Sequence, residues 1–370
     1  MEKQAASIDG VQKLHKVNAE DVIIGYVGWE RIIGYEFNYV PSQSYFAGKI
    51  YFESGEEMEA RFLKFKKSEE ALVKKIFTQT SKLNHVGILR PFFFVYYEPQ
   101  NIWILCYDRF DYLLSELVDG EDPATNNRIL WCRTVIRNLL RTLKHIHFHD
   151  LFHMGLEETC NYVAVPSGIK IINVQNSLED LDDPVDPEQV NSWRIKNLKA
   201  LRDMLKKNMM LPGYDSWLGR NSFFDFFDNE DYEYCTFVER LENHPFLLTL
   251  EERRLWLVDI RSFVNESELK IILDDKAFDE YRDWNWFKDT APRFQSKYRR
   301  PYKEYDCKSV RDPVRFLKYV NLDWEEAADF EVKRSYVKLL NQIYLDMNVN
   351  VRSLNKILFS WSFHPCNYSS

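Results

Sequence analysis

The sequence predicts an α+β protein in which a strand-rich first part precedes a longer helical part. Between Trp29 and Phe110, alternating or aromatic and β-branched segments are separated by turn residues such as Pro41 and Ser54-Gly55. Beyond Asp119, apolar residues recur at spacings of three and four, which is typical of helices with one buried face. With 45% hydrophobic and 15% aromatic residues among 370, the chain has enough apolar side chains for two or three packed units.

The first part is expected to hold five strands with one helix inserted after the third, which is a distinctive order. The strands are expected at 31–37, 44–52, 59–65, 92–97 and 102–107, and the helix at 68–83. The helical part is expected to hold helices at 129–147, 190–205, 236–243 and 250–263, with a hairpin of strands 162–165 and 169–172 after the first. Residues 264–370 are expected to be wholly helical, with helices at 275–288, 309–320, 331–347 and 351–360. The acidic, proline-broken segment 179–188 is expected to be an exposed loop, and the sequence does not indicate its role.

The composition excludes several classes of protein. The net charge of −8 argues against binding of polyanions through overall charge, and no DNA partner is expected. The 6 cysteines are scattered without a Cys-x-x-Cys pair, so we expect neither a zinc site nor a disulfide framework. The start of the chain shows no signal-peptide pattern, and no apolar run reaches membrane-spanning length. We therefore expect a cytoplasmic protein, with the nucleus as the alternative, and no membrane partner.

Four histidines near the end of the first long helix invite a metal site. His145, His147, His149 and His153 recur at spacings of two and four. Residues two apart on a helix face different sides, so the four side chains do not converge. We expect no metal site here and a structural role for His153.

Four short motifs resemble landmarks of the protein-kinase fold. Leu63-Lys64-Phe65 lies on the third strand, where a kinase holds its phosphate-contacting lysine. Residues 83–88 (LNHVGI) end the first helix, and 153–156 (HMGL) stand where the catalytic loop belongs. Residues 244–246 (HPF) match a phrase that commonly closes the second kinase lobe. The resemblance implies a two-lobed protein-kinase-like fold.

The groups that kinase chemistry needs are absent from the matching positions. Gly155 stands at the position that the resemblance assigns to the catalytic aspartate, and Asn173 at that of the magnesium-binding aspartate. Cys160 stands at the position of the metal-binding asparagine, and Asn161 lies one residue beyond it. A neutral amide cannot supply the anionic oxygens that Mg²⁺ prefers. We expect no phosphoryl transfer, no metal and no cofactor. Lys64 is interpreted as a strand-lining lysine, with ATP binding without metal as the alternative.

The sequence that follows residue 246 resembles the kinase-extension nuclease (KEN) domain of the unfolded-protein-response kinase/endoribonuclease sensor and of ribonuclease L. The matching pieces are residues 244–254, Asp283-Trp284 and residues 302–318, which include SVRDPVRFLK. With the kinase-like half, the resemblance covers about residues 28–362. It implies an all-helical KEN-like extension after the two lobes.

In that family the resemblance implies metal-independent RNA cleavage by tyrosine, arginine, asparagine and histidine. By position, Tyr305 and Lys318 retain the tyrosine and a basic residue, whereas Tyr319 replaces the asparagine and Asp323 the histidine. An aspartate of ordinary pKa is ionised at neutral pH and is a poor general acid. We expect the nuclease centre to be inactive, so no catalytic residue is expected.

A basic run with interleaved aromatic residues lies within the extension. Such a pattern suits single-stranded RNA, through phosphate contacts and base stacking, although a solvated surface or an interface to an acidic protein has the same composition. The candidate RNA contacts are Arg299, Arg300, Lys303, Arg311 and Arg315.

The sequence thus predicts a catalytically inactive kinase- and ribonuclease-like protein that acts by binding. The expected partners are a second copy of the chain or an active kinase/ribonuclease relative, in regulation of RNA processing or stress signalling, with RNA as a further candidate. Two alternatives stay open: an active endoribonuclease using Tyr305 and Lys318, and an ATP-sensing module without metal. The predicted segments are a flexible lead-in (1–27), a kinase-like N-lobe (28–110), a kinase-like C-lobe (111–248), the KEN-like domain (249–362) and a tail (363–370).

Overall fold

The structure is a computed structural model that describes part of the chain. The described residues are 15–16, 26–27, 30–116, 126–178, 186–209, 220–228, 233–249 and 252. They fall into two compact units that alternate along the sequence. The first takes its described residues from 1–125, 134–211 and 231–239, and the second from 126–133, 212–230 and 240–370.

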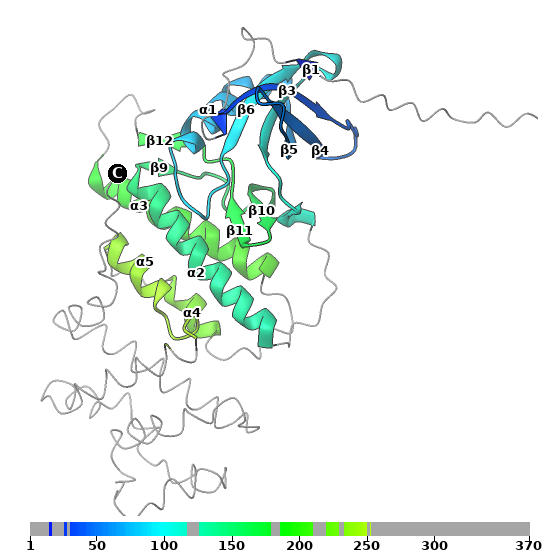
Figure 1. The fold of residues 1–370 in the computed structure, drawn as a ribbon. Coiled ribbons are helices and arrows are strands. Elements are labelled where there is room, and N and C mark those ends of the chain that lie inside the picture. Colours follow the sequence, from blue (N-terminus) through cyan, green and yellow to red (C-terminus); the bar gives the residue numbers. More distant parts are fainter. Residues whose placement is uncertain are drawn as a thin grey trace, which may run out of the picture. The chain divides into compact units, whose positions relative to one another are not determined.

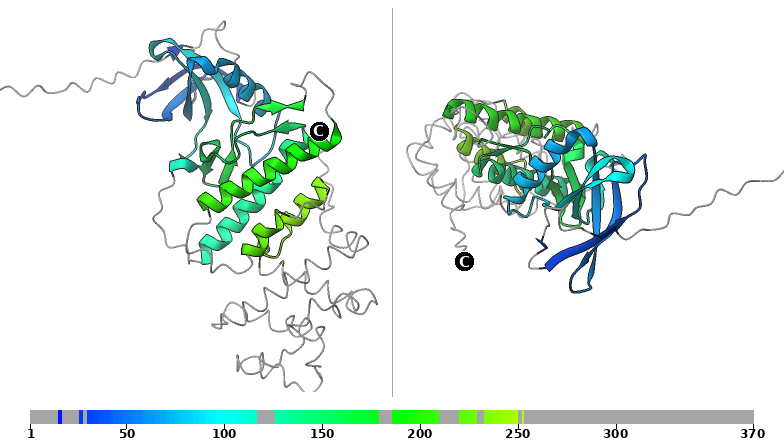
Figure 2. Two further views of the ribbon diagram at one scale, coloured as in Figure 1. Left: turned by 180° about the vertical axis from the view of Figure 1, so that it is seen from behind. Right: turned by 90° about the horizontal axis from the view of Figure 1, so that it is seen from above.

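A seven-stranded antiparallel sheet forms the first part of the described chain (Figure 1). Its order is β1-β3-β4-β5-β7-β6, and β2 pairs with β3 beside this path. The strands are β1 (His15–Lys16), β2 (Tyr26–Val27), β3 (Glu30–Phe37), β4 (Tyr45–Phe52), β5 (Glu57–Lys66), β6 (Pro91–Tyr97) and β7 (Ile102–Asp108). Helix α1 (Glu70–Ser81) follows a 3-10 turn at Lys67–Glu69 and packs on β6 and β7 (Figure 2). The five predicted strands and the inserted helix are confirmed.

The long strands bury side chains on both faces of the sheet. On β5, Ala60 and Phe62 enter one apolar cluster, whereas Leu63 and Phe65 pack in another together with α1. The first cluster, here called the outer cluster, includes Ile32, Tyr35, Phe46, Ile50, Phe62, Phe93 and Ile104. The second, here called the α1 cluster, includes Leu63, Val73, Ile76, Phe94, Leu105, Tyr107, Val163 and Ile172. Because successive side chains of a strand point to opposite faces, two apolar clusters require a strand that is apolar on both sides.

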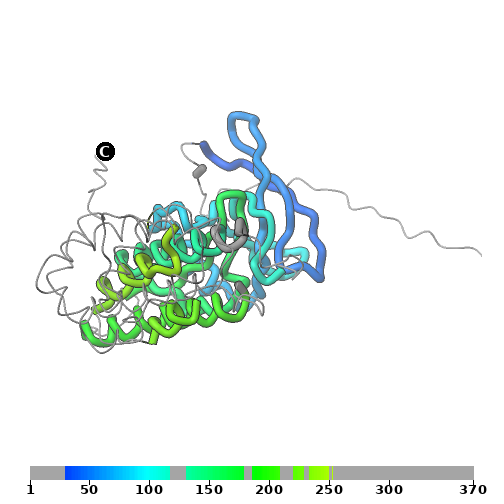
Figure 3. Tube along the Cα trace, turned by 90° about the horizontal axis from the view of Figure 1, so that it is seen from below, coloured from blue at the N-terminus to red at the C-terminus, as the bar shows by residue number. Residues whose placement is uncertain are grey.

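Helices and short strand pairs make up the next part of the chain, which Figure 3 traces to α5 in yellow-green. The helices are α2 (Asn126–Phe148), α3 (Pro187–Met204), which continues as a π-helical turn at Leu205–Met209, and α5 (Tyr234–Glu242). The strands are β8 (Tyr112–Leu113), β9 (Leu151–Phe152), β10 (Tyr162–Val165), β11 (Gly168–Ile171) and β12 (Asn176–Ser177). The predicted hairpin and these three helices are confirmed, whereas β8, β9 and β12 were not predicted. None of the described helices is long and apolar enough to cross a membrane.

The predicted loop over residues 179–188 is wrong at its C-terminal end. Asp186 caps helix α3, because its side chain accepts a hydrogen bond from the backbone N–H of Glu188 at 3.1 Å. Pro187 occupies the first turn, where its missing N–H costs nothing and its fixed φ suits the helix. The acidic residues at this end therefore begin a helix, with their negative charge at its N-terminus. Residues 179–185 lie outside the described part.

In the second unit, helix α4 (Arg220–Phe226) packs aromatic rings against the phrase at 244–246. The Phe223 ring lies 5.3 Å from the rings of His244 and of Phe246, measured between centroids. Sequence periodicity did not predict α4. A capping box follows, in which Thr249 and Glu252 exchange side-chain to backbone hydrogen bonds of 2.7 and 3.2 Å. The rest of the helix predicted over 250–263, and all helices predicted beyond it, lie outside the described residues.

Candidate functional site

A chain of neutral side chains fills the place where the kinase resemblance puts metal-binding groups. The Tyr107 hydroxyl donates to Asn173 Oδ1 at 2.8 Å, and Asn173 Nδ2 donates to Asn161 Oδ1 at 2.9 Å. Asn161 Nδ2 in turn donates to the carbonyl oxygen of Gly155 at 2.7 Å. Burial holds the pKa of Tyr107 above its usual range, so the phenol stays protonated. Four residues from four segments are thus joined by amide and hydroxyl groups alone.

Asn173 is positioned by its backbone as well as by its side chain. Its φ is 62°, in the left-handed region that asparagine adopts more readily than most residues. The adjacent residue Ile172 is held by two contacts: its N–H donates to the Asn161 carbonyl at 3.0 Å and its carbonyl accepts from His153. The backbone conformation of Asn173 and the hydrogen bonds of its neighbour Ile172 therefore fix the position of the Asn173 amide.

Asn161, and not Cys160, provides the amide of this chain. Cys160 is exposed, and the next residue, Asn161, makes the hydrogen bonds to Asn173 and Gly155. The loop at Thr159–Asn161 forms a 3-10 turn that directs Asn161 toward Asn173 and Gly155. A β-carbon at Gly155 would come within 2.8 Å of Asn161 Nδ2. An aspartate at Gly155 would therefore force Asn161 to move.

A buried histidine orients the loop that carries Gly155. The Gly155 N–H donates to His153 Nδ1 at 3.1 Å, so the proton of the neutral ring lies on Nε2, which donates to the Ile172 carbonyl at 2.8 Å. Burial lowers the pKa of His153 to about 4. The predicted structural placement of His153 agrees with this geometry.

Asn197 on α3 joins His153 to a second buried histidine. Asn197 Oδ1 accepts the backbone N–H of His153 at 3.0 Å and lies 3.1 Å from His147 Nε2. The other nitrogen of His147, Nδ1, contacts the Tyr234 hydroxyl. Burial lowers the pKa of His147 to about 3. Sequence reasoning missed Asn197, because nothing in the sequence links an asparagine in a helix to histidines more than forty residues earlier.

The arrangement offers no site for the magnesium ion that kinase chemistry requires. Mg²⁺ prefers carboxylate and phosphate oxygens in octahedral geometry, whereas the chain from Tyr107 to Gly155 supplies only neutral oxygens that already accept hydrogen bonds. Across the part of the chain that the structure describes, no group of three or more His, Cys, Asp or Glu side chains is arranged to hold a metal ion. The residues present do not fit the metal.

Lys64 lies on the face of β5 opposite to α1. Its neighbours Leu63 and Phe65 belong to the α1 cluster, and side chains alternate along the strand. Lys64 Nζ donates to the carbonyl oxygen of Pro41 at 2.9 Å. The side of β5 that faces α1 presents Arg61, Leu63 and Phe65 instead of a lysine.

The aromatic residues that follow Gly34 belong to the outer cluster. Tyr35 is buried, and its ring lies 5.5 Å from that of Phe93. Phe37 stacks on Phe46 at 5.5 Å. Burial raises the pKa of Tyr35 to about 12. These rings therefore fill the sheet's own core.

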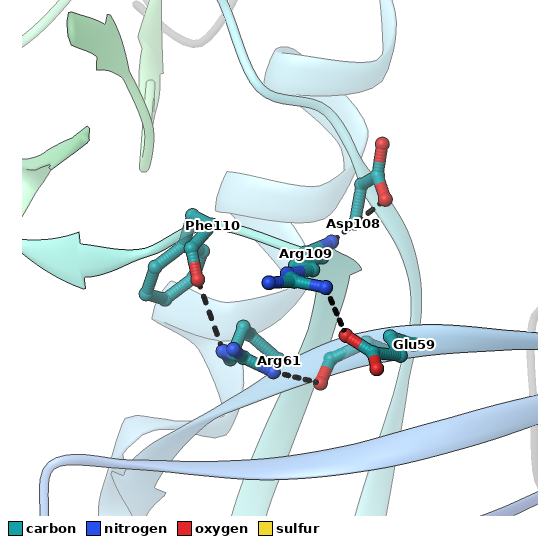
Figure 4. Close-up of polar contacts among 6 residues, drawn as sticks. Glu59, Arg61, Asp108, Arg109 and Phe110 are labelled. Carbon is teal, nitrogen blue, oxygen red and sulfur yellow. Dashed lines mark hydrogen bonds and ion pairs between the residues drawn. The ribbon is translucent and has the colours of Figure 1, made fainter. Parts of the chain in front are cut away.

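Side chains from β4 and β5 hold the segment that follows β7 (Figure 4). Arg61 Nε donates to the Phe110 carbonyl oxygen at 3.1 Å, and the Arg109 guanidinium pairs with Glu59 at 2.7 Å. The Tyr45 ring lies 5.0 Å from the Phe110 ring. Residues 108–116 join the sheet to the helical part, so these contacts fix the connection between them.

Three histidines gather near the end of α2, which sequence reasoning did not predict. His145 and His149 lie one helical turn apart, and their ring centroids are 4.6 Å apart. His85, from the segment between α1 and β6, stacks on His145 at 4.8 Å. His147 and His153 point elsewhere, into the buried network around Asn197.

The candidate residues of the extension lie outside the described part of the chain. These are Arg299, Arg300, Lys303, Tyr305, Arg311, Arg315, Lys318, Tyr319 and Asp323. The predictions made for them stay predictions.

Comparison with known proteins adds little to this geometry. No family model matches the sequence, and no curated protein matches it. One similar solved structure is the crystal structure of Rad53 1-466 in complex with AMP-PNP, with 16% sequence identity and a TM-score of 0.35. The match covers 58% of this chain and 65% of that chain, slightly less than two thirds of its length. The chain is an α+β protein in which an antiparallel N-terminal sheet precedes helices.

Proposed function

We propose that this chain is a catalytically silent, kinase-like protein that works by binding other macromolecules. The observation that carries the proposal is the neutral chain Tyr107–Asn173–Asn161–Gly155. In a kinase, magnesium ions held by an aspartate and an asparagine neutralise the charge that develops on the transferred phosphoryl group, and a second aspartate orients the attacking hydroxyl. Here both carboxylates are missing, and the remaining amides are bonded to one another.

The site also resists repair by a small rearrangement. A metal ion between Asn161 and Asn173 would have to break their mutual hydrogen bond at 2.9 Å and gain only neutral oxygens in return. An aspartate at Gly155 would displace the Asn161 side chain, because its β-carbon would lie 2.8 Å from Asn161 Nδ2. Lys64 is bonded to the Pro41 carbonyl on the other face of the sheet. Three separate features thus oppose phosphoryl transfer.

The binding surfaces that we propose are those that the resemblance to the KEN family implies. Residues 249–362 are proposed to be a KEN-like helical domain without a working nuclease centre, because Tyr319 and Asp323 replace the asparagine and histidine that the family uses. The chain is proposed to pair with itself or with an active kinase/ribonuclease relative and so to regulate RNA processing or stress signalling. This part of the proposal rests on the sequence.

A thermal shift assay of the full chain tests the nucleotide part of the proposal. We expect an unchanged melting temperature with ATP, with or without Mg²⁺. A ligand present at a hundred times its Kd would stabilise the native state by about 2.7 kcal/mol, which is easily measured. A rise that needs no metal and disappears in Lys64→Ala would favour the ATP-sensing alternative, and transfer of labelled phosphate to a peptide would overturn the proposal.

The partner and nuclease parts need separate measurements. Sedimentation velocity of the chain alone, and mixed with an active relative, should show a dimer or a mixed complex at micromolar concentration. A fluorogenic RNA substrate should not be cleaved above background. Cleavage that is lost in Tyr305→Phe would instead identify an active endoribonuclease, and monomers in every mixture would remove the pairing part of the proposal.

A further inference from the structure

The three histidines at the end of α2 include one ring whose hydrogen bonding changes with its protonation. His85 Nδ1 accepts the backbone N–H of Gly87 at 3.1 Å. The same nitrogen lies 3.4 Å from Thr142 Oγ1 on α2. Thr142 has already donated its only hydroxyl hydrogen to the Asn138 carbonyl at 2.7 Å, so its oxygen can only accept. His85 Nδ1 therefore stands between one donor and one acceptor.

These two neighbours favour opposite protonation states of the ring. When His85 is neutral with its proton on Nε2, Nδ1 accepts from Gly87. When His85 is protonated, Nδ1 carries a hydrogen that faces the Gly87 N–H and can be donated to Thr142 instead. Protonation of His85 thus replaces the hydrogen bond from Gly87, within the segment 82–90, by a hydrogen bond to Thr142 on α2.

The charges around the ring oppose protonation. Burial, and then the positive charge of Arg141 on α2, lower the pKa of His85. The stacked ring of His145 has its pKa lowered to about 4 by burial and by its neighbours His85 and His149. The carboxylates that flank this end of α2 are already paired, Asp150 with Arg194 and Glu239 with Lys144. The causes that lower the pKa values of His85 and His145 are burial and positive or histidine neighbours.

The segment that carries His85 is connected to the candidate site. Gly87 packs so closely on α2 that a β-carbon would lie 1.9 Å from Thr142 Oγ1. The Gly87 carbonyl accepts the Ile171 N–H at 2.9 Å, and the Leu89 N–H donates to the Ile171 carbonyl at 3.1 Å. The next residue after Ile171 is bonded to Asn161. A change at Gly87 therefore reaches β11 and the neutral chain.

We propose that the protonation state of His85 controls how firmly the β11 strand is held. The neutral ring accepts the Gly87 N–H and so fixes Gly87, which is hydrogen-bonded to β11, whereas the protonated ring no longer accepts this N–H and the hold is released. Below neutral pH the protonated ring turns its hydrogen to Thr142 and leaves the Gly87 N–H without its acceptor. The folded state binds fewer protons here than the unfolded state, so the hold is complete above about pH 6.5 and weakens as the pH falls.

The proposal is tested by hydrogen–deuterium exchange of the full chain, followed by mass spectrometry and corrected for intrinsic exchange rates. Peptides that cover residues 84–90 and 168–173 should lose protection by about fivefold between pH 7.5 and pH 5.5, a modest fraction of what a buried histidine can produce because these rings are partly exposed. Peptides from β4 and β5 should keep their protection, which separates a local release from global unfolding.

Two variants and one control make the test specific. In His85→Asn the side-chain oxygen can still accept the N–H two residues on but does not titrate, so protection at pH 7.5 should persist and its pH dependence should vanish. Arg141→Gln removes a positive neighbour and should move the response to higher pH. His364→Gln, a histidine far along the sequence, should behave as the wild type. Wild-type protection that does not change with pH, or an unaltered pH response in His85→Asn, would overturn the proposal.

Discussion

Replacing Asn197 by alanine should destabilise the first unit strongly, because one side-chain oxygen serves two buried donors. Asn197 Oδ1 accepts the His153 N–H at 3.0 Å and lies 3.1 Å from His147 Nε2. Asn197 is only 3% exposed and the two histidines 1% each, so water cannot replace the lost acceptor without rearrangement. A buried donor left without a partner costs about 1–3 kcal/mol. Since the two donors share one acceptor, their costs do not simply add, and we expect a loss of about 3 kcal/mol.

Urea unfolding of the full chain, followed by tryptophan fluorescence and by circular dichroism, measures this loss. With an m value of about 2–3 kcal/mol per molar urea, the midpoint should fall by about 1 M. Lys196→Ala is the matched control, because Lys196 is the exposed neighbour of Asn197 on α3 and its loss should be within about 0.5 kcal/mol.

A second variant shows whether the loss comes from the missing hydrogen-bond acceptor, because it keeps an oxygen at this position. Asn197→Asp keeps an oxygen for both donors and should lose less than Asn197→Ala, because a carboxylate beside His147 favours the protonated ring and offsets the cost of burying a charge. A loss below about 1 kcal/mol in Asn197→Ala, or equal losses in the alanine and aspartate variants, would show that the two hydrogen bonds do not hold this network together.

Three further outcomes follow from the packing, the capping and the buried histidines. Phe62→Ala should cost about 3–5 kcal/mol in urea unfolding, since Phe62 is fully buried between the strands of the outer cluster; a loss under about 1 kcal/mol would contradict its place in the core. Asp186→Ala should cost about 1 kcal/mol, whereas Asp186→Asn should retain the cap of α3 and nearly all the stability. The pKa values of His147 and His153 are lowered by burial to about 3 and about 4, so the folded state is stabilised above pH 6.5 and loses stability as the pH falls from 6.5 toward 4; equal urea midpoints at pH 7.5 and pH 5.0 would refute this.

The strands of the sheet could be predicted from sequence because each is a run of aromatic and β-branched residues bounded by turn residues. The face on which Lys64 lies could not be predicted. On β5, Ala60 and Phe62 point to one side and Leu63 and Phe65 to the other, so both sides are apolar and alternation gives no polar face. Only the packing of α1 on one side of the sheet distinguishes them.

The short elements were missed for a different reason. Strands such as β9 and β12 have two residues each, and each is a strand only because its partner lies opposite, about 25 residues along the chain. A two-residue segment has no periodicity to detect. Helix α4 is also short, and its aromatic residues read as an apolar run and not as a helical stripe.

Two members of the hydrogen-bonded chain could be located from sequence, and the others could not. Gly155 and Asn173 were singled out by their positions in motifs, and both belong to the hydrogen-bonded chain. Asn161 lies one residue beyond Cys160, and which of the two meets Asn173 depends on how the loop at Thr159–Asn161 folds. The cluster of His85 with His145 and His149 was missed, since His85 is about sixty residues away in sequence.

The sequence by itself determined the order of strands and helices and the loss of the carboxylates, because periodicity and residue identity are local properties. The tertiary structure alone decided how the neutral groups at those positions are bonded, which way Lys64 points and which histidines meet. These features depend on contacts between segments far apart in the chain, and the hydrogen-bonding capacity of a side chain says nothing of its partner until the backbone has brought the two together.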